Sequence, residues 1–312
     1  MKRTLGLLLL FVLLGGSAYF FTQKESKKTK STVLGWDRHF KVENPDDIKK
    51  IFIAQRTGAE PATFERKNDH WIYNGKYRAR QTAVDNIMEV LTTVKMHSIP
   101  AKAAYENIIN EMASQGIKIE VYGNSSEPLK VWYLGGVTSD ERATYAIMEG
   151  SDQPFVVEIP RMEGTLRPRF ELSDDEWRDR AVFRDKIADI QSVSIEYPKQ
   201  RNKSFKLNAT ENGYEVKPFY DITAPINRPV SRGNVEAFLM GFEEIIAENF
   251  VNYMKEGKKD SISNTVPFVQ LNLKRKDGTE KQATLFIRDN ISQTGIHRSE
   301  VAERYWAAVS NT

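Results

Sequence analysis

The part of the sequence that decides the fold is Glu176-Trp177-Arg178-Asp179-Arg180-Ala181-Val182-Phe183-Arg184-Asp185, which runs on into Ile190-Gln191-Ser192-Val193-Ser194-Ile195. This stretch lies near the middle of the chain, between one run of predicted strands and a second run with the same order. We interpret it as the joint between two related halves.

The half before the joint alternates between short apolar runs and turn residues. Asn74-Gly75 supplies the positive φ that a tight hairpin turn needs. Thr82 is predicted to cap a helix whose apolar residues follow a spacing of three and four, and Gly116 is predicted to end a second helix. The predicted strands are residues 51–53, 63–65, 71–73, 117–122, 131–134, 145–147 and 155–157, and the predicted helices cover 84–94 and 105–112.

The half after the joint repeats this order. Three short strands around Val193, Phe205 and Tyr214 precede a helix at residues 235–242, and a hairpin follows with Asp277-Gly278 at its turn. Repetition of strands, helix and hairpin in one chain indicates an internal duplication. We therefore predict an α+β fold of two tandem antiparallel-sheet-plus-helix units, the first at residues 45–186 with the joint and the second at 187–312.

The N-terminus predicts a membrane segment. Lys2 and Arg3 precede an apolar run over residues 5–21, and a Lys-rich tether follows over residues 23–44. About 17 apolar residues reach the lower limit for a spanning helix, so we expect residues 1–22 to form a retained signal anchor that contacts membrane lipid. The alternative is cleavage after Ala18, which would release a periplasmic protein. The expected location is the bacterial cytoplasmic membrane, crossed once, with the C-terminal body extracytoplasmic.

The composition narrows the functional classes. The net charge is only +3 and no basic, aromatic-rich face is visible, so no nucleic-acid partner is expected. The chain has no cysteine, which excludes disulfides and thiol catalysis. No metal-ligand or nucleophile-elbow pattern occurs, so no catalytic residue, metal or cofactor is predicted. Gly135-Gly136 is interpreted as a strand-end turn or bulge. The sequence does not determine the oligomeric state.

The joint carries the densest mixture of aromatic and charged residues. Ser173 and Glu176 have the spacing of a capping box. Two interpretations of the following residues stay open: Arg–Asp pairs and tryptophan packing that hold the structure together, or a contact for a partner or an anion. The residues in question are Trp177, Arg178, Arg180 and Arg184.

Five aromatic residues elsewhere are candidates to line a sugar or peptide groove: Trp132, Tyr133, Tyr145, Phe155 and Trp306. Trp132 and Tyr133 are neighbours on one predicted strand, so alternation places them on opposite faces and at most one lies in a one-sided core. We expect the one that faces outward to contact a partner.

A family resemblance follows from the order of motifs around the joint. These motifs are Trp132-Tyr133-Leu134-Gly135-Gly136, Ala143-Thr144-Tyr145-Ala146, Phe155-Val156-Val157, and Trp177-Arg178-Asp179-Arg180 with Phe183. The succession resembles the bacterial domain-of-unknown-function family DUF4340, and its Trp-Arg-Asp-Arg form resembles members from the Bacteroidota. The resemblance implies an N-terminal hydrophobic segment, an extracytoplasmic body and an association with gliding-type transporter auxiliaries. It lends no catalytic residues.

Two hypotheses of function follow. The first is a non-enzymatic envelope protein, a membrane-anchored scaffold or accessory subunit with a membrane-protein partner, for instance in an ABC-transporter or gliding-type complex. The alternative is an extracytoplasmic ligand-binding or hydrolytic module with its site between the two units.

Overall fold

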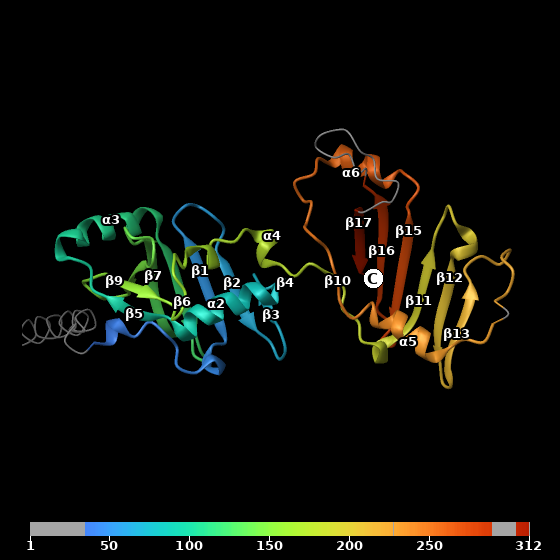
Figure 1. The fold of residues 1–312 in the computed structure, drawn as a ribbon, viewed down its shortest axis with the longest axis horizontal. Coiled ribbons are helices and arrows are strands. Elements are labelled where there is room, and N and C mark those ends of the chain that lie inside the picture. The colour runs from blue at the N-terminus through green and yellow to red at the C-terminus, as the bar shows by residue number, and fades with distance from the viewer. Residues whose placement is uncertain (1–34, 227, 289–303, 312) are drawn as a thin grey trace, which may run out of the picture. The chain divides into compact units, whose positions relative to one another are not determined.

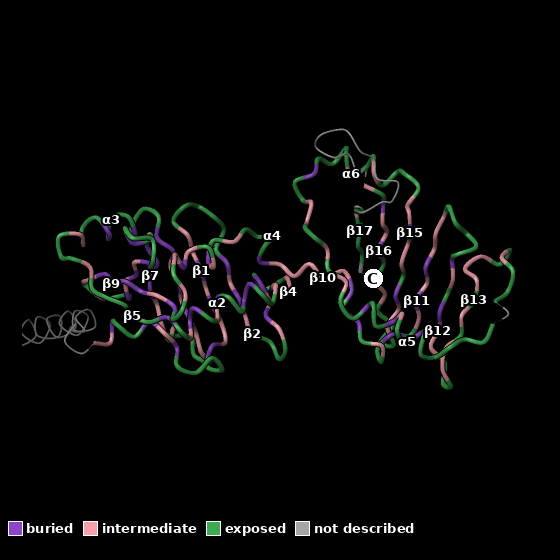
Figure 2. Tube along the Cα trace, in the orientation of Figure 1, coloured by how far each residue is buried: buried purple, intermediate pink, exposed green. Residues whose placement is uncertain are grey.

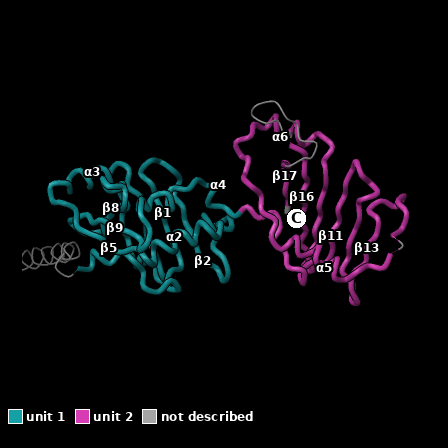
Figure 3. Tube along the Cα trace, viewed as in Figure 1, with its two compact units in different colours: residues 1–179 teal, residues 180–312 magenta. Residues whose placement is uncertain are grey.

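A computed structural model describes residues 35–226, 228–288 and 304–311 of the chain. The predicted anchor at residues 1–22 and the predicted tether as far as residue 34 lie outside the described residues. The chain divides into two compact units, one ending at Asp179 and the other beginning at Arg180 (Figure 3). The sequence predicts this division after residue 186. Each helix in the described part of the chain is too short or too polar to span a bilayer.

Unit 1 is built on one antiparallel sheet of nine strands (Figure 1). The strands are β1 (Lys50–Gln55), β2 (Ala62–Arg66), β3 (Trp71–Tyr73), β4 (Tyr77–Arg78), β5 (Lys95–Ser98), β6 (Ile117–Tyr122), β7 (Pro128–Val137), β8 (Thr144–Met148) and β9 (Phe155–Glu158). The helices are α2 (Gln81–Thr93), α3 (Tyr105–Gln115) and α4 (Asp174–Trp177), with 3-10 turns η2 (Trp36–Arg38), η3 (Pro45–Asp47), η4 (Lys102–Ala104) and η5 (Arg167–Arg169). The strand order is β4-β3-β2-β1-β6-β7-β8-β9-β5.

The core of unit 1 follows from alternation in the central strands. Ile51 and Ile53 of β1 are buried, whereas Phe52 between them is only partly buried (Figure 2). On α2, Val84, Ile87 and Leu91 are 0–1% exposed, as expected for one apolar face of an amphipathic helix. Burial of each such side chain contributes roughly 1.5–3 kcal/mol, so the core holds α2 on the sheet.

The start of unit 1 differs from the prediction. The predicted tether extends to residue 44, whereas Phe40 and Val42 are 1% and 7% exposed. The Phe40 ring lies edge-on to Trp132, with 5.6 Å between the ring centroids, and the Val42 amide donates to the Leu91 carbonyl at 2.7 Å. A short apolar pair inside a polar segment gives no periodic signal, so the sequence pattern missed it.

Two local predictions in unit 1 are confirmed. Asn74 and Gly75 have φ angles of 47° and 67° and form the turn after β3. Gly135 and Gly136 lie where the pairing of β7 with β8 shifts register, between Leu134 and Val137. A Cβ on Gly135 would come within 2.7 Å of the Met112 side chain on α3. The missing side chain of Gly135 therefore lets α3 approach the sheet closely.

The predicted helix cap at Thr82 is wrong. Helix α2 begins at Gln81, its N-cap is Arg80, and Arg80 makes no side-chain capping bond. The Arg80 amide instead donates to the Trp177 carbonyl at 2.8 Å. A distant segment thus contacts the backbone at the start of the helix, and a local capping pattern contains no information on such a contact.

Unit 2 holds a second antiparallel sheet, of six strands. These are β11 (Ile190–Glu196), β12 (Phe205–Thr210), β13 (Gly213–Pro218), β15 (Val269–Arg275), β16 (Glu280–Ile287) and β17 (Tyr305–Asn311). A two-stranded ribbon pairs β10 (Ala181–Phe183) with β14 (Ile245–Ile246). The helices are α5 (Arg232–Met240) and α6 (Glu256–Ser263), with 3-10 turns η6 (Ile187–Asp189) and η7 (Arg201–Lys203).

The six-stranded order is β13-β12-β11-β15-β16-β17. Six consecutive strands of the first sheet have the order β3-β2-β1-β6-β7-β8. In each sheet the first strand in chain order, β1 or β11, lies in the interior beside β6 or β15, the strand that follows the helices. The predicted α+β class with antiparallel sheets is confirmed, and the predicted hairpin at Asp277-Gly278 joins β15 to β16, with Gly278 at φ 90°.

Candidate functional site

The joint residues of unit 1 are packed into its own core. Trp177 is 2% exposed, and its ring lies edge-on to Phe64 with 5.0 Å between centroids. The predicted capping box at the start of α4 is confirmed, since the Ser173 amide donates to the Glu176 carboxylate at 2.8 Å. The box starts the single helical turn that directs Trp177 inward.

Arg178 makes its contacts within unit 1. Its Nη1 lies 3.3 Å from a carboxylate oxygen of Asp174 and 3.4 Å from one of Asp175. Its guanidinium lies 3.9 Å from the centroid of the Tyr77 ring, in cation–π geometry. Arg178 therefore links α4 to the β3–β4 hairpin. Tyr73 of the same hairpin also contacts α4: burial, together with a hydrogen bond to the Asp174 carboxylate, raises the pKa of Tyr73 above its ordinary value.

Arg180 and Arg184 belong to unit 2. Arg180 donates to the Glu248 carbonyl and, at 3.2 Å, to the Asn249 side chain. Arg184 pairs with Glu244 at 3.7 Å. The Ala247 amide donates to the Arg180 carbonyl at 2.9 Å, which extends the β10–β14 ribbon. These two arginines bind the joint strand to the segment that follows α5.

A buried carboxylate completes this part of unit 2. The side chain of Asp185 is 1% exposed and accepts from the Arg275 guanidinium on β15, while the Arg184 amide lies 3.2 Å from its other oxygen. A buried charge is tolerated only when it is paired and hydrogen-bonded. The sequence around Asp185 carries no local signal for this role, because only its distant partner Arg275 makes it distinctive.

The four predicted site residues are therefore not gathered within either unit. Trp177 and Arg178 contribute to unit 1, and Arg180 and Arg184 contribute to unit 2. Their contacts hold each unit together, as in the interpretation that assigns them to ion pairs and tryptophan packing. A partner or anion contact at these residues stays a prediction, as does a ligand site between the units.

The two neighbouring aromatic residues of β7 differ in burial, as alternation along the strand predicts. Trp132 is 0% exposed, whereas Tyr133 is partly exposed on the opposite face of the strand. Burial and the neighbouring Glu149 carboxylate raise the pKa of the Tyr133 phenol. A partner contact at Tyr133 stays a prediction.

Sequence reasoning missed a polar pocket of about 430 Å³ in unit 1. His97 and Ser98 on β5 line it, opposite Glu158 on the paired strand β9. The turn after β7 contributes Thr138, Ser139, Asp140 and Arg142. No pattern marked β5, because Lys95–Ser98 is short, polar and without alternation.

The chemistry of this pocket is that of polar binding. His97 Nδ1 lies 2.9 Å from the Glu158 carboxylate, which also pairs with Lys95 at 3.1 Å. The Thr138 hydroxyl donates to Asp140 at 2.6 Å and lowers the pKa of that carboxyl. Within the described residues no hydroxyl is hydrogen-bonded to His97, so the geometry of an activated serine is not present there. The pocket offers charges of both signs to a polar ligand.

Metal-binding geometry is not found in the described part of the chain, where no three His, Asp or Glu side chains gather closely enough to hold an ion. Of the four histidines, His39, His70 and His97 are described and His297 lies outside the described residues.

Comparison with known proteins places the chain in a family. No curated protein matches it, and no solved structure matches it. A family model described as "Domain of unknown function (DUF4340)" matches residues 70–264. The match runs from β3 through the joint to α6 and covers more than half of the 312 residues. The Bacteroidota affiliation stays an expectation. The chain therefore belongs to the DUF4340 family of domains of unknown function.

Proposed function

We propose that this protein is a non-enzymatic scaffold of the bacterial cell envelope, anchored by residues 5–21, with both units outside the cytoplasmic membrane. It serves as an accessory subunit of a membrane complex, for instance a transporter. The apolar N-terminal run supports the anchor. The association that the family resemblance implies with transport systems supports the complex.

We further propose that the two units are copies of one fold. The shared six-strand order supports this. The position of the helix supports it too. In chain order α2 comes after β3 and before β6, and α5 comes after the corresponding β13 and before the corresponding β15. Because of the duplication, the pairing and burial of each strand in one unit can be compared with those of its counterpart in the other.

The observation that carries the proposal is a difference between two equivalent strands. Strand β8 pairs with β7 on one side and β9 on the other. Its counterpart β17 pairs with β16 alone among the described strands. Unit 1 buries Ala146 and Met148 of β8 at 0% and 4% exposure, whereas Val309 of β17 is 45% exposed.

An open strand edge with an exposed apolar face is a template for strand addition. Such edges are usually protected by charged residues or proline, and Tyr305–Asn311 contains neither. In unit 1 the neighbour at this place is β9, with the apolar sequence Phe155-Val156-Val157. The occupant that fits β17 is an extended, apolar segment of a membrane-protein partner.

Photo-crosslinking in the native cells tests this function. A photoreactive residue at Val309 in the full chain should capture one integral membrane protein. The matched control is Val137, a valine of similar exposure, 40%, on β7. Ala307→Lys places a charge beside Val309 on the same face of the strand, and it should abolish the crosslink because strand addition would bury the ammonium group. Equal capture from positions 309 and 137, or capture unaffected by Ala307→Lys, would overturn the proposal.

A second candidate function is the binding of a small polar ligand, and the polar pocket at His97 favours it. Its volume of about 430 Å³ falls in the range of small-molecule sites. A ligand that raises the melting temperature of the wild-type chain but not of Arg142→Ala would favour this function over the scaffold.

A further inference from the structure

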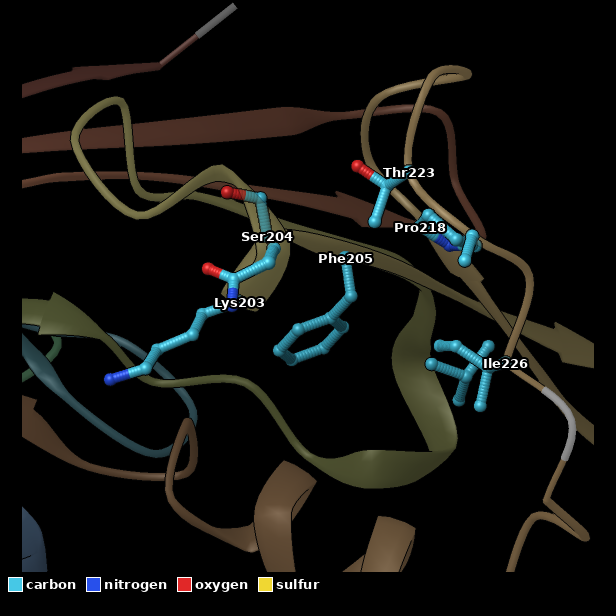
Figure 4. A pocket seen from close by; sticks show the side chains of 9 residues that line it. Lys203, Ser204, Phe205, Pro218, Thr223 and Ile226 are labelled. Atoms are coloured by element: carbon cyan, nitrogen blue, oxygen red, sulfur yellow. The ribbon is translucent and has the colours of Figure 1, made fainter.

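Unit 2 presents an apolar surface where β13 ends. A pocket of about 240 Å³ lies there, lined by Phe205, Val216 and Pro218 from the sheet and by Thr223 and Ile226 from the segment that follows it (Figure 4). We call the described residues 219–226 the apolar loop. Ile222 in this loop is 85% exposed and Ile226 is 45% exposed. Large aliphatic side chains this exposed next to an apolar pocket mark a contact surface.

Hydrogen bonds and ring contacts define the conformation of the apolar loop. The Phe219 amide donates to the Ser204 carbonyl at 3.0 Å, and the Thr223 amide donates to the Tyr220 carbonyl at 3.0 Å. The rings of Phe219 and Tyr220 pack edge to face at 5.0 Å. The Tyr220 hydroxyl donates to the Glu196 carboxylate on β11, and this hydrogen bond raises the pKa of the phenol. These contacts hold the base of the loop while Ile222 projects from it.

Five basic residues, which we call the basic rim, lie in the segment that leads into β12 and just after the loop: Lys199, Arg201, Lys203, Lys206 and Arg228. Residues 199–206 contain four basic residues and no acidic one, although the whole chain has a net charge of only +3. The Arg201 guanidinium lies 5.2 Å from the Tyr220 ring centroid, and the Lys206 ammonium lies 4.9 Å from that of Phe219. The cations are thus placed directly beside the apolar loop.

Part of the rim has no internal counterion. Lys199, Lys203 and Arg228 are exposed, and none of them has an ion pair within the described part of the chain. Figure 4 shows the Lys203 side chain extending away from Ile226. Asp221 is the one acidic residue of the apolar loop. The surface therefore favours an anionic partner.

We propose that the apolar loop and the basic rim dock on an anionic lipid bilayer, with Ile222 entering the boundary between headgroups and acyl chains. Projecting aliphatic side chains flanked by lysine and arginine are the usual composition of interfacial membrane contacts. The pocket is smaller than the roughly 300 Å³ at which small-molecule sites begin. The docking is a property of unit 2 and does not depend on the N-terminal anchor or on the β17 partner.

The absence of cysteine from the chain permits a direct test with the full-length protein. Ile222→Cys carries an environment-sensitive fluorophore, and Tyr253→Cys, at an 82% exposed position of the same unit, is the matched control. Both proteins are reconstituted with vesicles of phosphatidylcholine alone or mixed with phosphatidylglycerol. Quenchers attached to the lipid tails report insertion. Both substitutions are exposed, so their unfolding midpoints should equal that of the wild type.

The expected result is quenching at position 222, not at 253, on the anionic vesicles alone. Each basic residue near an anionic surface strengthens binding roughly fivefold, the equivalent of about 1 kcal/mol. Removing three charges by Lys199→Gln, Lys203→Gln and Arg228→Gln should therefore weaken insertion about 100-fold. Added salt should weaken it too, because it screens the charges.

Three results would overturn the proposal. One is a label at 222 that stays as hydrated as the label at 253. Another is equal quenching on neutral vesicles. The last is shielding of position 222 that survives removal of lipid from the native particle, which would assign the surface to a protein partner. An anchored protein that lacks this docking would leave the proposed scaffold function intact.

Discussion

Substitution of Trp177 by alanine tests whether this side chain holds the structure of unit 1 together or serves as a contact for a partner. The side chain is 2% exposed, and a buried tryptophan removes roughly 200 Å² from water. At 25 cal/mol per Å² this burial corresponds to about 5 kcal/mol. Measured losses for buried Trp→Ala fall at roughly 3–5 kcal/mol, and the edge-on contact with Phe64 is lost as well. We expect Trp177→Ala to destabilise unit 1 by about 4 kcal/mol.

Equilibrium unfolding in urea measures this loss. Because the chain has two units, it can unfold in two transitions, and only the one belonging to unit 1 should move, with an unchanged slope. Trp306→Ala is the control, since it removes the same side chain from a partly exposed position on β17, and we expect it to cost about 1 kcal/mol. If Trp177→Ala cost less than Trp306→Ala, the buried joint would be refuted.

Further predictions concern charges and the anchor. Asp185→Ala should destabilise unit 2 by about 3 kcal/mol in urea unfolding, because it leaves Arg275 without its buried partner. The control is Glu211→Ala at an exposed position, and an equal loss of stability in both variants would contradict a stabilising role of the Asp185–Arg275 pair. Burial raises the pKa of Glu120, but hydrogen bonds from Lys118 and Tyr122 outweigh it, so the pKa is lowered overall. Ionised Glu120 thus stabilises the fold above its unfolded pKa. Glu120→Gln should lower the free energy of unfolding by about 1 kcal/mol at neutral pH, and urea titrations should show this loss vanish as the pH falls below 4.5. A loss of stability that persists in acid would show that it does not come from the charge of Glu120. The native protein should resist a carbonate wash and begin at Met1 by N-terminal sequencing; a chain beginning at Tyr19 would refute the anchor over residues 5–21 and favour the soluble binding module.

The sequence predicted the elements whose signals are local. Alternation located β1 and β6, the three-four spacing located α2, and Asn74-Gly75 and Asp277-Gly278 located the turns of two hairpins. The capping box of α4 spans three residues and was equally readable. In these places the backbone conformation depends on neighbours in the chain, and propensity and pattern therefore suffice.

Contacts between distant segments were not predicted. The cation–π pair of Arg178 with Tyr77, the ion pair of Asp185 with Arg275 and the pairing of His97 with Glu158 all join separate parts of the chain. Each depends on strand order and register, which one sequence does not specify for charged residues. The wrong cap at Thr82 is also accompanied by a distant contact, because the N-cap Arg80 donates its amide to the Trp177 carbonyl.

The central claim, an accessory subunit within a membrane complex, is tested most directly by the mass of the native particle. The full chain is extracted from its own membranes in mild detergent and measured by native mass spectrometry. The account predicts a particle heavier than one chain that contains a second, integral membrane protein, and that loses this protein in Ala307→Lys. A monodisperse particle with the mass of a single chain, under several extraction conditions, would contradict it.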